Sequence, residues 1–129
     1  MSARISCLLV SLSMILGPGC ASRGALRGDG SAFTARDYLR TAWTTLIEAE
    51  TDTAGHRVRA QKETQAALEA LNELTSTAKV VPYEGPPTLA VALELLQHSE
   101  VEISRRASPA ALEHTRRAED ELKAALARK

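Results

Sequence analysis

The sequence predicts an all-α protein, an antiparallel helical bundle that follows a signal-like N-terminus and a disordered tether. Three observations lead to this fold class. From Phe33 onwards the chain is dominated by Ala, Leu, Glu, Arg and Lys, which all have high helix propensity. Apolar residues recur there at steps of three and four, the spacing of one face of a helix. Gly and Pro are concentrated at a few positions that separate these periodic stretches.

Residues 1–19 have the composition of a signal peptide. Arg4 and the α-amino group supply positive charge, and the twelve residues from Ile5 to Leu16 carry none. A helix of that length rises about 18 Å, well short of the roughly 30 Å hydrocarbon core of a bilayer. Gly17 and Pro18 then stop it. We therefore expect an export signal that is removed, and not a transmembrane helix.

The residues Gly17-Pro18-Gly19-Cys20 resemble the lipobox of bacterial lipoproteins. In that family a cysteine that follows a small residue is lipidated on its sulfur and becomes the new N-terminus. The resemblance implies a lipid on Cys20 that anchors the chain to a periplasm-facing membrane. By resemblance to enterobacterial lipoproteins, the Ala21 that follows implies transfer to the outer membrane.

A second interpretation takes Gly19 and Ala21 as the two small residues of an ordinary signal-peptidase site. Cleavage there releases a soluble periplasmic or secreted protein that begins at Ser22. Both interpretations describe an exported chain. In both, Cys7 is removed with the signal and no cysteine follows Cys20, so disulfides and thiolate metal sites are excluded from the rest of the protein.

The mature chain is expected to have two parts, the lipidated cysteine with a flexible tether at residues 20–32 and a helical bundle domain at residues 33–129. Between Ala21 and Ala32 the chain is rich in small and polar residues and shows no apolar period. A random coil of this length reaches about 20 Å.

The first part of the bundle domain favours one long helix from about residue 35 to residue 78, bent near Gly55. Thr34 is the expected N-cap of this helix. A glycine inside a helix costs only about 1 kcal/mol, and the apolar step continues beyond Gly55 to Leu74 and Ala78. The alternative is a break at Gly55, which gives a bundle of four shorter helices in place of three.

Residues 80–87 are the clearest break in the domain, because three prolines and a glycine forbid a helix there. We expect the chain to reverse its direction at this point. Thr88 is the expected N-cap of the next helix, and Ser108-Pro109 begin the last one. The coiled-coil-like seams are rich in alanine, so the core is expected to be thin, with Leu71 and Leu96 as core positions.

A candidate metal site is formed by Glu94, His98 and Glu102, which recur at every fourth residue and share one face of a helix. Carboxylate and imidazole groups bind divalent metals in ferritin-like bundles. The favoured interpretation is a solvent-exposed helix face on which these residues and Arg106 form side-chain pairs between positions i and i+4.

Two aromatic residues, Tyr83 in the proline-rich stretch and Trp43, are candidates for contact with a partner. The favoured interpretation of the stretch is a simple connector, with Tyr83 packed on the end of the bundle. The last helix interleaves charges of both signs and is expected to present a solvated face, made up of Glu113, Arg116, Arg117, Glu119, Asp120 and Lys123.

Composition and motifs exclude several classes of function. Basic and acidic residues number 16 each, and removal of residues 1–19 takes away Arg4 alone, which leaves 15 against 16. With aromatic residues at 3%, nucleic-acid binding is not expected. His56 and His114 lie among charges but in no catalytic motif, and no cofactor signature is present.

The sequence therefore predicts a non-enzymatic lipoprotein of the cell envelope that acts as a structural or protein-interaction module. Its expected partners are the membrane, through the lipid, and another envelope protein or a second copy of the chain. The alternative is a periplasmic helical bundle that binds a small ligand or a metal.

Overall fold

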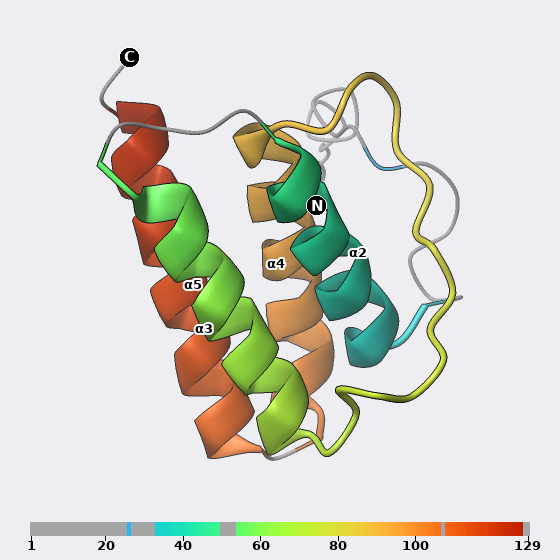
Figure 1. Ribbon diagram of the computed structural model, residues 1–129. Coiled ribbons are helices and arrows are strands. Elements are labelled where there is room, and N and C mark those ends of the chain that lie inside the picture. The colour runs from blue at the N-terminus through green and yellow to red at the C-terminus, as the bar shows by residue number, and fades with distance from the viewer. Residues whose placement is uncertain (1–25, 27–32, 50–53, 107, 128–129) are drawn as a thin grey trace, which may run out of the picture.

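The computed structural model describes residues 26, 33–49, 54–106 and 108–127. These residues form four helices and no β-strand: α2 (Ala35–Glu48), α3 (His56–Ala70), α4 (Leu89–Ser104) and α5 (Pro109–Ala127) (Figure 1). The predicted all-α bundle is confirmed, and of the two predicted versions the structure adopts the one with four helices. Cys20 and the signal region lie outside the described residues.

The four helices form a bundle in which neighbours run antiparallel (Figure 1). α2 packs against α3 and α4, and α5 packs against the same two helices. α3 and α4 are diagonal to each other and run in the same direction, so their C-terminal ends meet. An ion pair of 2.9 Å between Arg106 and Glu73 joins these two ends.

The start of α2 follows the prediction. The Thr34 hydroxyl accepts from the backbone N–H of Asp37 at 3.3 Å, and the Asp37 carboxylate accepts from the backbone N–H of Thr34 at 3.0 Å. The two reciprocal bonds satisfy two N–H groups that a helix start otherwise leaves unpaired. The other Asp37 oxygen accepts from the backbone N–H of Lys79 at 2.9 Å. Burial raises the pKa of Asp37, but hydrogen bonds from the Thr34 and Lys79 backbones outweigh it and hold the pKa below its ordinary value.

The favoured prediction of one long helix from 35 to 78 is wrong. α2 ends at Glu48 and α3 begins at His56. Gly55 precedes α3 with φ +77°, a left-handed conformation that glycine adopts without the steric cost other residues meet. The two helices then pack side by side. Burial of two apolar faces against each other outweighs the gain from extending a single helix.

The end of α3 is set by Asn72, which the sequence prediction passed over. Asn72 has φ +60° and is the one described non-glycine residue with positive φ. The backbone N–H of Glu73 donates to the carbonyl of Leu68, and that of Asn72 donates to the carbonyl of Glu69, both at 2.9 Å. This is the Schellman arrangement, in which asparagine often takes the left-handed position. Residues 73–78 therefore lie outside the helix.

The predicted reversal at residues 80–87 is present, but it joins a non-helical segment to a helix and not one helix to the next. The chain between α3 and α4, residues 71–88, is here called the connection, and it runs back along the whole of α2 (Figure 1). α4 therefore begins at the opposite end of the bundle and runs parallel to α3. Its predicted cap is confirmed, because the Thr88 hydroxyl accepts from the backbone N–H of Val91 at 3.1 Å. The start of α5 at Pro109 is confirmed as well.

The core is thin, as predicted, because many of its side chains are alanine. Leu96 is fully buried, whereas Leu71 is only partly buried and packs at the margin, so its assignment to the core is wrong. The fully buried leucines and the other large apolar side chains come from all four helices and the connection: Tyr38, Leu39, Leu46, Leu68, Val81, Leu95, Leu96, Ile103 and Leu122.

Candidate functional site

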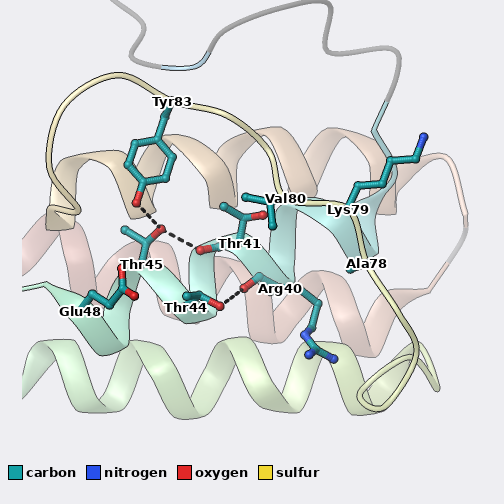
Figure 2. Close-up of a pocket in the computed structure, with 9 residues that line it drawn as sticks. All are labelled: Arg40, Thr41, Thr44, Thr45, Glu48, Ala78, Lys79, Val80 and Tyr83. Atoms are coloured by element: carbon teal, nitrogen blue, oxygen red, sulfur yellow. Dashed lines mark hydrogen bonds between the residues drawn. The ribbon is translucent and has the colours of Figure 1, made fainter.

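A groove lies between α2 and the connection (Figure 2). Its cavity measures about 250 Å³. We call it the α2 groove, and its walls are formed by Arg40, Thr41, Thr44, Thr45, Glu48, Ala78, Lys79, Val80 and Tyr83. Of these residues, the sequence predicted a role in binding for Tyr83 alone. The others could not be assigned to a site because the groove exists only once the connection lies along α2.

The connection is fixed to α2 at alternate residues. The backbone N–H of Lys79 donates to Asp37 at 2.9 Å, and that of Val81 donates to the Thr41 hydroxyl at 3.0 Å. One turn away, the Arg40 guanidinium donates to the backbone carbonyl oxygens of Leu74 and Ser76. The wall of the groove is therefore built into the fold, and no rearrangement is needed to form it.

The hydroxyl groups in the middle of the groove are already engaged (Figure 2). Thr44 donates to the backbone carbonyl of Arg40 at 3.1 Å, and Thr45 donates to that of Thr41 at 2.7 Å. The hydroxyls of Thr45 and Tyr83 lie 3.4 Å apart. Helical threonines commonly bond back to the preceding turn in this way. The middle of the groove thus offers few free hydroxyl groups to a ligand.

The two ends of the groove carry opposite charges. Figure 2 shows Glu48 beside Thr45 at one end, and Lys79 and Arg40 at the other, where their two charged groups point to opposite sides. Glu48 and Lys79 are exposed, and among the described residues neither has an ion pair or a side-chain hydrogen bond. Arg40 and Glu48 are eight residues apart on α2, which corresponds to about 12 Å along the helix axis.

The two predicted partner residues do not come together in one site. Tyr83 lines the groove and is half-buried, so it packs along the side of α2 and not on the end of the bundle as expected. Trp43 is also half-buried, but it is not part of the groove wall. Its indole Nε1 is shielded from solvent without a hydrogen-bond partner.

Leu26 departs from the predicted tether. It forms an isolated antiparallel bridge with Tyr83 and packs against the core, and its backbone N–H lies 3.5 Å from a carboxylate oxygen of Glu94. Leu26 is therefore docked on the connection, where the sequence predicted only flexible coil. Residues 20–25 and 27–32, including Cys20, lie outside the described residues.

The candidate metal residues Glu94, His98 and Glu102 contact separate partners. The His98 ring stacks on Tyr38, with 5.3 Å between ring centroids, and Glu102 pairs with Arg105 at 3.1 Å. Within the described part of the chain, no three His, Cys, Asp or Glu side chains are grouped so that they could hold a metal ion. The geometry therefore lends the metal interpretation no support.

Glu119 does not lie on the solvated face predicted for the last helix, because it is only 4% exposed. Its carboxyl group faces Glu100 of α4, which also pairs with Arg116 at 2.8 Å. Burial, with the hydrogen bond and negative charge of Glu100, raises the pKa of Glu119 to about 8. The two groups therefore share one proton at neutral pH, as close carboxyl pairs do.

Two histidines bridge α3 and α5 in a reciprocal manner. His56 of α3 contacts Glu121 of α5, and His114 of α5 contacts Glu63 of α3, both at 2.7 Å. The hydrogen bond from His56, together with Arg59, lowers the pKa of Glu121. Each histidine is thus satisfied by a carboxylate on the facing helix, as a structural pair is.

A repeat in the sequence underlies this symmetry and is the signal that the sequence analysis missed. Residues 56–68 and residues 114–126 are identical at seven of thirteen positions. The identical pairs are His56/His114, Arg59/Arg117, Ala60/Ala118, Glu63/Glu121, Ala66/Ala124, Ala67/Ala125 and Leu68/Leu126. On each of the two helices a His and a Glu are seven residues apart. Because α3 and α5 are antiparallel neighbours, the His of each helix lies opposite the Glu of the other, which gives two His–Glu contacts.

No family model, curated protein or solved structure matches this chain. Among the helices described, none combines the length and apolar character that crossing a bilayer requires. The α2 groove and the sequence features are therefore the basis on which a function is proposed.

Proposed function

We propose that this protein is a non-enzymatic lipoprotein of the cell envelope, anchored through Cys20, that binds another envelope component in the α2 groove. The signal-like residues 1–19 and the lipobox-like residues 17–20 support export and anchoring. The bundle supplies a rigid support, and the groove supplies the binding surface. The protein is thus an interaction module held at a membrane.

The observation that carries the proposal is a preformed groove with an exposed charge of opposite sign at each end, Glu48 at one and Lys79 at the other. Binding to a preformed site costs less ordering entropy than binding to a mobile one. Glu48 and Lys79 are exposed at the two ends of the groove, and the described residues provide no counter-charge that pairs with either. Glu100, by contrast, pairs with Arg116 at 2.8 Å within the bundle.

The anchor is tested by the intact mass of the protein from the host's membrane fraction, beside a Cys20→Ser variant. We expect a chain that begins at Cys20 and carries acyl groups, and we expect the variant to lose them. An unmodified chain that begins at Ser22 in the soluble fraction would refute the anchor.

The groove is tested by crosslinking from Thr44, which lies in its middle. Cysteine occurs only at positions 7 and 20, so Thr44→Cys adds one free thiol to a lipidated protein, and a photoreactive group can be attached there. The matched control is Glu69→Cys, an exposed site on α3. We expect a defined adduct from position 44 that is lost when Glu48→Gln and Lys79→Met are added. Equal adducts from positions 44 and 69 would refute the groove as the binding surface.

The size of the cavity favours a second candidate function, the binding of a free small ligand. At about 250 Å³, the cavity lies just below the range of about 300–1,000 Å³ that is usual for ligand pockets. The crosslinking experiment separates the two candidates, because a protein partner adds kilodaltons to the adduct and a small ligand competes the adduct away.

A further inference from the structure

We infer that the α2 groove binds a short extended peptide with free ends, its ammonium group at Glu48 and its carboxylate at Lys79. This inference rests on the proposed function, since it names the kind of ligand that the same groove takes. Three properties of the groove lead to it: its length, the polarity of its ends and the chemistry of its middle.

The length of the groove selects an extended chain of about four residues. Arg40 and Glu48 are eight helical residues apart, or about 12 Å. An extended peptide advances about 3.3 Å per residue, so the ends of a tetrapeptide are about 13 Å apart. A compact cofactor of similar volume cannot reach both ends of the groove at once.

The polarity of the ends fixes the direction of the ligand. Glu48 is the last residue of α2, and the last turn of that helix holds no basic residue. A carboxylate there meets the negative end of the helix dipole, so an arriving ammonium group relieves an unfavourable interaction. At the other end, the Arg40 guanidinium is held by the carbonyls of Leu74 and Ser76, and the long Lys79 side chain has no described partner. This end attracts a carboxylate.

The chemistry of the middle selects small apolar side chains. The hydroxyls of Thr44 and Thr45 donate to the backbone of α2, and the Thr41 hydroxyl accepts from Val81. Along the middle of the groove, the exposed side chains are those of Thr44 and Val80, and Val80 is 78% exposed at the rim. A polar side chain in the ligand would find few unpaired groups here, whereas alanine fits without desolvation cost.

The test uses tetraalanine as the probe. It is titrated into the ¹⁵N-labelled full chain, and the NMR amide signals of Thr44 and Val81 are followed. We expect saturable shifts of both signals. N-acetylated and C-amidated tetraalanine should each bind about fivefold more weakly, since each has lost one exposed ion pair. Unmodified tetraalanine that causes no shift at either residue would overturn the inference.

Two variants establish which end binds which group. In Glu48→Gln, acetylation of the probe should no longer weaken binding, because the ammonium has already lost its partner. In Lys79→Met, amidation of the probe should no longer weaken binding, because the carboxylate has already lost its partner. Glu69→Gln and Lys62→Met, exposed positions on α3, are the matched controls and should leave both effects unchanged. Acetylation that weakens binding to Glu48→Gln as much as to the unmodified protein would overturn the assigned direction.

The failure of this inference and that of the proposed function give different results. A protein adduct from Thr44→Cys that depends on Glu48 and Lys79, with no response to tetraalanine, removes the short peptide as ligand and leaves the groove as an interaction surface. If neither an adduct nor a response to the peptide is seen, both the short-peptide ligand and the groove as a binding surface are refuted.

Discussion

Replacement of Glu119 by glutamine should remove a proton that the α4–α5 interface holds at neutral pH. Glu119 is 4% exposed and faces Glu100, and its pKa is raised to about 8 from an ordinary value of 4.5. Between these two values the folded state binds one proton more than the unfolded state. The free energy of unfolding therefore falls as the pH rises, by up to about 1.4 kcal/mol per pH unit.

From pH 5 to pH 8 this slope amounts to a loss of at most about 4 kcal/mol, and we expect about 2–4 kcal/mol. The opposing contribution of Glu100, whose pKa is lowered chiefly by the hydrogen bond from Glu119 and by Arg116, falls below pH 4.5 and so outside this range. A glutamine is close in shape to the protonated carboxyl group and does not titrate. Glu119→Gln should therefore keep its stability up to pH 8.

The assay is urea unfolding at four values between pH 5 and pH 8 for the unmodified protein and for Glu119→Gln. Glu113→Gln is the control, because Glu113 is an exposed residue of α5 that pairs with Arg117 across one turn. Because the three proteins differ only at these two positions, the contributions of all other groups cancel in the difference. If the curves of Glu119→Gln and the unmodified protein run parallel over the whole range, the reasoning about the buried acid is refuted.

Three further predictions follow from the fold. Leu96→Ala should lower the free energy of unfolding by about 2–4 kcal/mol, and Leu71→Ala by about 1 kcal/mol, because only Leu96 is fully buried; equal losses in chemical denaturation would contradict this placement of the core. Asn72→Ala should cost about 1 kcal/mol and Asn72→Gly close to none, since φ is +60° there, and a lower melting temperature for the glycine variant would argue against the cap. Added zinc should leave the thermal midpoint unchanged, whereas a rise that His98→Ala abolishes would revive the metal site at Glu94, His98 and Glu102.

The local features of the fold were predictable from the sequence because short-range physics decides them. Thr34 and Thr88 cap helices in the way that their hydroxyl groups favour, and Pro109 begins a helix where its missing N–H costs nothing. The apolar spacing identified Leu96 and the alanine seams as buried. Each of these predictions needs only a few neighbouring residues.

The features that were missed depend on contacts between distant residues. The three- and four-residue spacing of apolar residues continues past Gly55. Only the packing of α3 against α2 decides that the chain turns back there. Asn72 was a local signal that could have been used, because asparagine tolerates the left-handed conformation. Glu119 resembles its exposed neighbours in sequence, and its burial follows from the position of α4.

The α2 groove is the clearest case of this limit. Asp37 and Thr41 are ordinary residues of an amphipathic helix until residues about forty positions later, Lys79 and Val81, donate their backbone N–H groups to them. A prediction from periodicity alone places neither bond. The repeat that relates His56 to His114, by contrast, was present in the sequence and would have indicated that α3 and α5 pair.

The docking of Leu26 on Tyr83 sets how far the bundle can stand from a membrane. If the chain is anchored at Cys20, six residue steps separate the anchor from the docked residue, and even a fully stretched chain of that length covers only about 20 Å. The docked side of the bundle then stays within about 20 Å of the lipid anchor. Because Tyr83 belongs both to the docking contact and to the wall of the α2 groove, a partner in the groove has to bind close to the surface of the bilayer.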